Sequence, residues 1–280
     1  MIGAYLRTLR QDQNLTLIEA ADVLGISAEH LERTEGGRRP LSQEQLEQLI
    51  DRFPSCGPHE QRTLRGLLAP TSAQFVGRGA DPDMVLDCAP GWTARLRACE
   101  RHASDIVTYS AGLVPAILRT DAYSEAFCAD ALTQQQRRLG PARALPRGDR
   151  RRVLVLLDEC GLRQPVGGPC VMAAQLAHLL RASARGDAQI QIVPRMENLR
   201  LPAGFHSELR IRGRLLFVSE GVDASYFSGP AAEGAHGPYL RAAINGAHSV
   251  EHSRTLLDTA RADFQRRAEP SPTQEWRGPR

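Results

Sequence analysis

Glu29 and Arg33 have side chains of the kinds that can recognise bases in a nucleic-acid groove. A guanidinium can donate two hydrogen bonds to O6 and N7 of guanine, and a carboxylate can accept one from N4 of cytosine. Arg38 and Arg39 follow shortly after and are candidates for contacts with phosphates. The full set of candidate DNA-contacting residues is Ser27, Ala28, Glu29, His30, Arg33, Arg38 and Arg39.

The segment 15–40, LTLIEAADVLGISAEHLERTEGGRRP, predicts the two helices that would position these side chains. Its apolar residues recur with helical spacing up to Gly25, where the first helix is expected to end. Ser27 is a typical N-cap for a second helix, Ala28–Glu35, whose Leu31 turns inward. A short helix, a glycine turn and a capped second helix form the helix-turn-helix pattern, in which the second helix enters the major groove. The inward positions predicted for the first helix and turn are Leu15, Ile18, Ala21, Val23, Leu24 and Ile26.

Three further helices are predicted around this pair, over residues 2–13, 43–53 and 58–68. Ser42 is the expected N-cap of the second of them, which carries Leu46, Leu49, Ile50 and Phe53 on one face. Five short helices in about 70 residues resemble the lambda-repressor-like, Xre-type DNA-binding domain. In that resemblance, Ala28 and Leu17 occupy positions where glutamine is common.

The charge of residues 1–53 opposes ordinary DNA binding. This stretch carries six basic and nine acidic residues, hence −3, whereas the whole chain carries +3. Because phosphate neutralisation supplies much of the affinity for DNA, the basic footprint must be local. It would comprise Arg33, Arg38 and Arg39, with Arg7 and Arg10 as further candidates. The alternative is a helix-turn-helix retained as a folding or dimerisation unit with weak affinity for DNA.

The remainder of the chain predicts a second domain of mixed helices and strands. Residues 70–91 are rich in Pro, Gly and Asp and are predicted to be a linker. Helices are predicted over 92–106, 171–184 and 249–264, and strands over 152–157, 190–193, 207–211 and 215–219, the last two as a hairpin. The predicted organisation is a helical domain (1–69), the linker (70–91), an α+β domain (92–265) and a disordered tail (266–280).

Two stretches of this second domain, LVPAILRTDAY and LRQPVGGP, carry a further resemblance. With CERHASDIVTYSAG before the first and IQIVP after the second, they resemble actinobacterial antitoxin-like regulators that join an Xre-type helix-turn-helix to a long C-terminal domain. Ala116 and Arg119 depart from the family's pattern, which is closer to VPGLLQT. The resemblance implies a cytoplasmic transcriptional regulator, often encoded beside a small partner protein that its C-terminal domain engages.

Other chemistries find little support in the residue pattern. His248-Ser-Val-Glu251-His252 spells the HxxEH motif of inverted zinc peptidases, but Ser249 is the expected N-cap of a helix, which would leave His248 outside it. Gly167-Gly168-Pro169 is expected to be a tight turn into a helix, since the chain contains no Lys for a phosphate-binding loop. The six cysteines form no CxxC pair. Asp158 and Glu159, at the end of a predicted buried strand, are the candidate partner or ligand contacts.

The residues therefore predict a multi-domain regulator, with an all-α helix-turn-helix domain followed by an α+β domain. A homodimer would place two recognition helices on double-stranded DNA, and the C-terminal domain would sense a small partner protein or a small-molecule effector. We expect no catalytic residues, metal, cofactor or membrane contact. The alternative from another class is a small-molecule-binding or catalytic protein built on the C-terminal domain, with a lapsed helix-turn-helix.

Overall fold

The structure, a computed structural model, describes residues 3, 6, 7, 10, 11, 13–35, 42–52, 61, 65, 84–87, 92–129, 151–195, 204–211, 213–221 and 223–269. Contacts within the chain divide it into two compact units. The first unit comprises Met1–Val107, Pro146–Arg152 and Phe205–Leu240. The second unit comprises Thr108–Leu145, Val153–Gly204 and Arg241–Arg280. Among the described residues, no helix combines the length and hydropathy that crossing a membrane requires.

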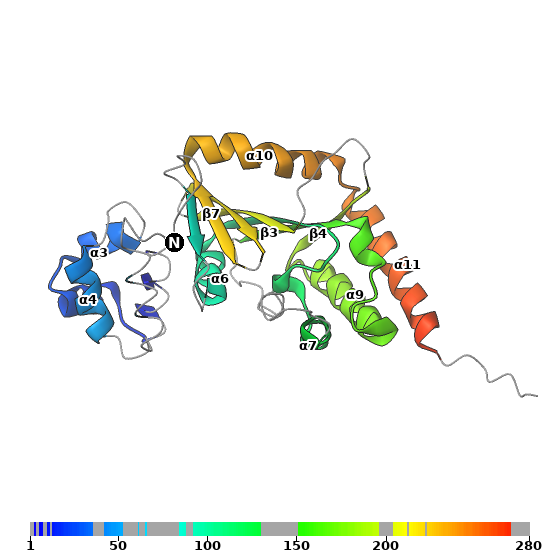
Figure 1. The fold of residues 1–280 in the computed structure, drawn as a ribbon, viewed down its shortest axis with the longest axis horizontal. Helices are drawn as coiled ribbons and strands as arrows, with labels where there is room; N and C mark the ends of the chain where they lie inside the picture. The colour runs from blue at the N-terminus through cyan, green and yellow to red at the C-terminus, as the bar shows by residue number, and fades with distance from the viewer. Residues whose placement is uncertain are drawn as a thin grey trace, which may run out of the picture. The chain divides into compact units, whose positions relative to one another are not determined.

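The N-terminal residues of the first unit form the predicted helix-turn-helix domain (Figure 1). Its helices are α2 (Leu17–Leu24), α3 (Ala28–Glu35) and α4 (Gln43–Arg52). In the predicted first helix, residues 3, 6, 7, 10 and 11 are helical and Gln13 lies in a turn; in the predicted fifth helix, Gln61 and Arg65 are helical. The rest of those two segments lies outside the described residues. Gly25 ends α2 in the left-handed conformation at φ 65°, as predicted. A core of fully buried side chains joins the helices, namely Leu6, Ala20, Ala21, Leu24, Leu31, Leu46 and Ile50.

One inward position predicted for this domain is wrong. Ile18 is 65% exposed, whereas Ala20, Ala21 and Leu24 form the buried side of α2. The prediction failed because a helix turns about 100° per residue, so Ile18 cannot share a face with both Ala21 and Ala20.

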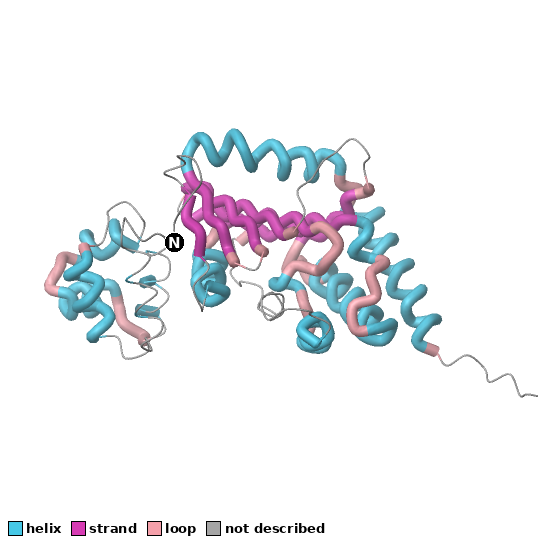
Figure 2. Tube along the Cα trace, in the orientation of Figure 1, coloured by secondary structure: helices cyan, strands magenta, loops and turns pink. Residues whose placement is uncertain are grey.

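The second domain contains both a sheet and helices (Figures 1 and 2). The sheet is mixed and has seven strands, in the order β1-β7-β6-β5-β2-β3-β4. The chain is therefore a helical helix-turn-helix domain followed by an α+β domain, as predicted. The strands are β1 (Met84–Asp87), β2 (Asp105–Ser110), β3 (Arg152–Asp158), β4 (Gln189–Val193), β5 (Phe205–Ile211), β6 (Arg214–Glu220) and β7 (Ala224–Ser228). The helices are α6 (Trp92–His102), η1 (Ala116–Leu118), α7 (Asp121–Ala129), η2 (Glu159–Leu162), α9 (Gly168–Ala184), α10 (Gly229–Gly246) and α11 (Val250–Ala268).

In the first unit, strands β5, β6, β7 and β1 pair antiparallel in that order, and β5–β6 is the predicted hairpin. Phe217 and Phe227 are register partners, and both contact the ring of His236 in α10. Tyr226, one position away, points to the opposite face and lies near Cys99 of α6. The strands therefore carry α10 on one face and α6 on the other, as Figure 2 shows.

In the second unit, β3, α9 and β4 form a parallel β-α-β unit. Leu176 and Leu179 of α9 are fully buried, and α11 packs along α9 (Figure 1). Gly167 adopts φ 67° before α9, and a side chain there would clash with Ala126 of α7. The Gly-Gly-Pro segment is thus a tight turn into a helix, as predicted, with Pro169 in the first turn.

Several predicted boundaries differ from the structure. Residues 84–87, assigned to the linker, form β1 and pair with β7. The helix predicted over 92–106 ends at His102, because the β-branched run from Ile106 to Thr108 belongs to β2. Helix α11 continues to Ala268, beyond the predicted start of the tail at Arg266, and residues 270–280 lie outside the described residues.

Candidate functional site

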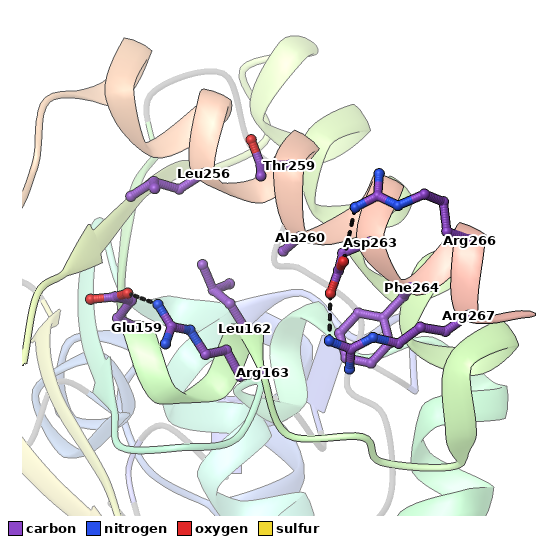
Figure 3. Close-up of a pocket in the computed structure, with 10 residues that line it drawn as sticks. All are labelled: Glu159, Leu162, Arg163, Leu256, Thr259, Ala260, Asp263, Phe264, Arg266 and Arg267. Atoms are coloured by element: carbon purple, nitrogen blue, oxygen red, sulfur yellow. Dashed lines mark hydrogen bonds and ion pairs between the residues drawn. The ribbon is translucent and has the colours of Figure 1, made fainter.

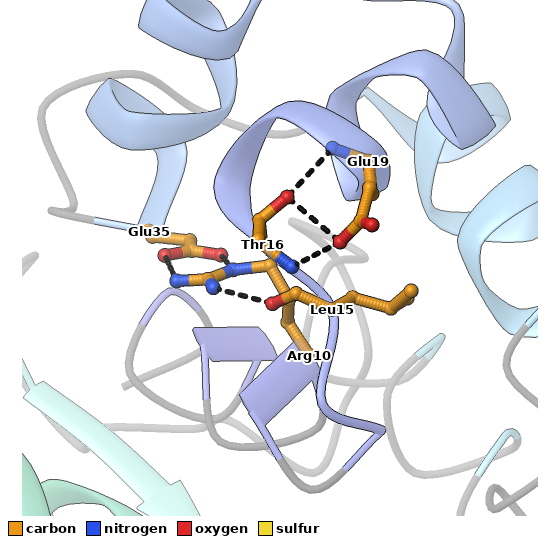
Figure 4. Close-up of polar contacts among 5 residues, drawn as sticks. All are labelled: Arg10, Leu15, Thr16, Glu19 and Glu35. Atoms are coloured by element: carbon orange, nitrogen blue, oxygen red, sulfur yellow. Dashed lines mark hydrogen bonds and ion pairs between the residues drawn. The ribbon is translucent and has the colours of Figure 1, made fainter.

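Capping hydrogen bonds stand at the start of both α2 and α3, and Figure 4 shows those of α2. The Thr16 hydroxyl accepts a hydrogen bond from the Glu19 backbone N–H, and the Thr16 backbone N–H donates to Glu19 Oε2 at 2.7 Å. That backbone bond holds the pKa of the Glu19 carboxyl below its ordinary value. Ser27 caps α3 as predicted, since its hydroxyl accepts from the His30 backbone N–H at 3.1 Å.

Glu29 and Arg33 share the exposed face of α3. Their side chains are 70% and 56% exposed, and Arg33 Nη2 lies 2.6 Å from Glu29 Oε1. The two candidate base-reading groups are therefore paired with each other.

The other candidates on this helix lie differently. Ala28 is half-buried at the start of α3, and Ser27 is exposed but occupied as the cap. The Nε2 atom of His30 is buried, so this ring is turned toward the domain. Arg38 and Arg39, the candidate phosphate contacts, lie outside the described residues.

Arg10, a further candidate for the basic footprint, has a different role in the structure. Its Nε and Nη2 atoms donate to the two carboxylate oxygens of Glu35 at 2.7 and 2.9 Å, and its Nη1 donates to the Leu15 carbonyl at 3.0 Å. The side chains of Arg10 and Glu35 are only 11% and 1% exposed. The hydrogen bond to Glu35 raises the pKa of Arg10. Arg10 therefore joins the N-terminal residues to the last turn of α3 and is withdrawn from any phosphate contact (Figure 4).

The candidate contacts Asp158 and Glu159 have separate surroundings at the carboxyl end of β3. The Asp158 side chain accepts from the Cys160 backbone N–H at 2.7 Å and from the Tyr109 hydroxyl at 3.3 Å. Burial, with Asp158 beside it, raises the pKa of Tyr109. The hydrogen bond with Asp158 also raises the pKa of the exposed Cys160 thiol, which disfavours a reactive thiolate. Asp158 therefore caps η2.

Glu159 instead lines a groove of about 500 Å³ between η2 and α11 (Figure 3). Its Oε1 atom lies 2.5 Å from Nη2 of Arg163, one turn along the chain. Across the groove, Asp263 of α11 pairs with Arg266 at 2.9 Å and with Arg267 at 2.6 Å. Sequence reasoning missed these residues of α11, because only the fold brings them to η2.

The His248–His252 segment covers the outer edge of β4. The His248 backbone N–H donates to the Ile192 carbonyl at 2.9 Å, and the Ser253 hydroxyl accepts from the Ile192 N–H at 2.9 Å. Ser249 is the N-cap of α11, as predicted, so His248 precedes the helix. The two histidine rings are in edge contact at 4.5 Å. Within the described ranges, no three His, Cys, Asp or Glu side chains gather as metal ligands would.

The stretch LVPAILRTDAY packs within the second unit. Arg119 is 5% exposed, donates through Nε to the Val114 carbonyl at 2.7 Å and lies over the Phe127 ring. Gln175 of α9 donates to the Leu118 carbonyl and accepts from the Thr120 N–H. Val114, Ile117 and Leu118 are buried, so this stretch packs within the domain.

In comparisons with known proteins, two families match separate stretches of the chain. Residues 2–54 match a family described as a helix-turn-helix domain, and residues 93–259 match one described as a domain of unknown function, DUF5753. Among solved structures, the archaeal chromatin protein TrmBL2, reported to show a novel mode of DNA binding, is similar at 11% identity. That likeness covers 84% of this chain and 87% of that one, but its TM-score is only 0.30. No curated protein matches. Since the second match spans more than half of the chain, the protein belongs to the DUF5753 family and carries a helix-turn-helix domain at its N-terminus.

Proposed function

We propose that this protein is a sequence-specific transcriptional regulator in which α3 reads DNA bases and the C-terminal domain binds a small partner protein or ligand. The observation that carries the proposal is the exposed Glu29–Arg33 pair on a helix that is capped and seated as a recognition helix. The match of residues 2–54 to a helix-turn-helix family supports it. The stretches LVPAILRTDAY and LRQPVGGP resemble those of antitoxin-like regulators with an Xre-type helix-turn-helix. This resemblance supports a cytoplasmic regulator of that kind.

In this proposal a homodimer places two copies of α3 in successive major grooves, about 34 Å apart. Arg33 donates to a guanine while Glu29 orients it or accepts from a neighbouring cytosine. Arg38 and Arg39 supply the phosphate contacts that the acidic remainder of the domain lacks. A partner or effector acts by changing the spacing of the two helices.

The test is the Arg33→Ala variant, measured by fluorescence anisotropy on an operator identified by chromatin mapping. We expect a loss of roughly 1–3 kcal/mol in binding free energy and a relaxed preference at one base pair. Arg185→Ala is the matched control, because the Arg185 side chain is 58% exposed and also pairs with a carboxylate, but lies just after α9 in the other domain. An affinity unchanged by Arg33→Ala would remove Arg33 from base recognition.

A second candidate function is favoured by the net charge of −3 over residues 1–53 and by the burial of Arg10. It is a small-molecule-binding or catalytic protein in which the helix-turn-helix serves only folding or dimerisation. Such a protein would show no salt-dependent binding to any DNA, since that dependence arises from phosphate neutralisation.

A further inference from the structure

The groove between η2 and α11 has an apolar floor. Leu162 and Phe264 are 5% and 2% exposed, and Leu256 and Ala260 complete the surface on the α11 side (Figure 3). Leu256, Ala260 and Phe264 are spaced by four residues, so they lie in one row along the helix. Ala260 is the small member of this row, and the space beside it forms part of the hollow.

The rim of the groove carries more positive than negative charge. Three arginines, Arg163, Arg266 and Arg267, share two carboxylates, Glu159 and Asp263, which leaves one positive charge in excess. The arginine side chains are 79%, 67% and 58% exposed. Within the described chain, each of these guanidinium groups uses one nitrogen, Nη2, in its ion pairs. The other N–H groups of each guanidinium therefore remain as hydrogen-bond donors that face solvent.

Arg267 also bridges the two parts of the groove. Its Cζ atom lies 5.3 Å from the centroid of the Phe264 ring, so the charge is held over the apolar floor. An anionic group bound here would meet the arginine donors while the body attached to it lies against Leu256 and Ala260, above the buried side chains of Leu162 and Phe264. The groove also begins where β3 ends beside the parallel strand β4, which is the edge at which open α/β sheets bind ligands.

We propose that this groove binds a small organic acid, with its carboxylate on the arginine rim and its aliphatic or aromatic body on the floor formed by Leu162, Ala260 and Phe264. The volume of about 500 Å³ suits a small molecule. The excess positive charge selects an acid over an alcohol or an amine with the same body. This inference rests on the ligand-binding role in the proposed function and names the chemistry of that ligand.

The experiment titrates the full-length chain with octanoate and, separately, with 1-octanol, by calorimetry and by methyl NMR of Leu162 and Leu256. DNA is absent, so failure here leaves the DNA-binding part of the proposed function untouched. We expect one-site, saturable binding of octanoate with a Kd of roughly 0.1–1 mM, at least tenfold tighter than that of 1-octanol, and shifts of both methyl groups.

Two variants and one control locate the site. Ala260→Phe should fill the hollow and abolish octanoate binding, and Arg266→Gln should weaken it severalfold. Arg261→Gln is the matched control, because Arg261 pairs with Asp258 at the same spacing as Arg266 with Asp263 but does not line the groove. Circular dichroism would verify that each variant is folded.

Three outcomes would overturn the proposal. The first is equal binding of octanoate and 1-octanol, which would mean that the arginines do not contribute. The second is binding unaffected by Ala260→Phe, which would place the acid elsewhere. The third is a shift of the same methyl groups with protein concentration alone, which would make the groove a contact between two copies of the chain.

Discussion

The buried ion pair between Arg10 and Glu35 should control the stability of the helix-turn-helix. Replacing Glu35 with Ala leaves the Arg10 guanidinium, in a side chain only 11% exposed, without its carboxylate. Removing one partner of a buried pair costs roughly 3–5 kcal/mol. Arg10 keeps some contact with solvent and its hydrogen bond to the Leu15 carbonyl. We therefore expect a loss of folding free energy at the lower end of this range, about 3 kcal/mol.

This loss should be visible in the exchange of backbone amides. If the domain unfolds as a unit with a free energy near 5 kcal/mol, a loss of about 3 kcal/mol leaves it folded but raises its opening more than a hundredfold. Hydrogen-exchange mass spectrometry of the full chain, on peptides that cover residues 13–35, measures this change. The apparent affinity for DNA at 25 °C should fall much less, because most molecules remain folded.

Two further variants distinguish the effect of a buried, unpaired charge from a general loss of stability. Glu29→Ala breaks the exposed pair on the same helix and should cost at most about 1 kcal/mol. The double variant Arg10→Met with Glu35→Leu removes both charges and should recover much of the lost protection. If Glu35→Ala exchanged at the wild-type rate, or if Glu29→Ala were equally damaging, the buried pair would not hold α3 in place.

Other perturbations have equally definite outcomes. Replacing Arg38 and Arg39 with Ala should weaken binding to all DNA sequences alike and lower the salt slope of binding by about one to two units, and an intact slope would refute the phosphate contacts. Burial and neighbouring arginines lower the pKa of His178 below 6.5, so the unfolded chain takes up the proton first and the folded state loses stability as the pH falls below 6.5. His178→Gln should therefore lose less of its Tm between about pH 7 and pH 5 than the wild type, as scanning calorimetry would show. Asp87→Ala leaves Arg95 without the carboxylate it holds at 2.7 Å in a fully buried pair, and should cost roughly 3–5 kcal/mol in chemical denaturation.

The helix-turn-helix was predictable because its signals are local. Gly25 must adopt a left-handed conformation to end α2, and Ser27 must offer its hydroxyl to the free N–H groups of α3. Both requirements are set by residues within one turn of the helix ends. The bounds predicted for α3 therefore coincide with Ala28–Glu35 in the structure.

The elements that sequence analysis missed are stabilised by distant partners. Strand β1 has four residues in a stretch rich in Pro and Gly, and it forms because β7 offers an edge and Arg95 binds Asp87. Helix α10 contains Pro238 and several glycines, which favour a loop, yet His236 and Leu240 pack it onto the sheet. A fragment that began at Trp92, the predicted start of the second domain, would lack β1 and leave Arg95 without Asp87.

The candidate site on α3 and the groove beside α11 also differ in how far the local sequence predicts them. Glu29 and Arg33 are one helical turn apart in the sequence, whereas the Arg10–Glu35 pair joins residues that no periodicity connects. The groove is harder to predict, since it needs Glu159 of η2 and Arg163, which follows η2, opposite Asp263 and its neighbours in α11. At this site the sequence shows only that a predicted buried strand ends at Asp158 and that a second acidic residue follows. Because a carboxylate next to a strand end can either cap the following turn or face a ligand, only the fold could assign capping to Asp158 and the groove to Glu159.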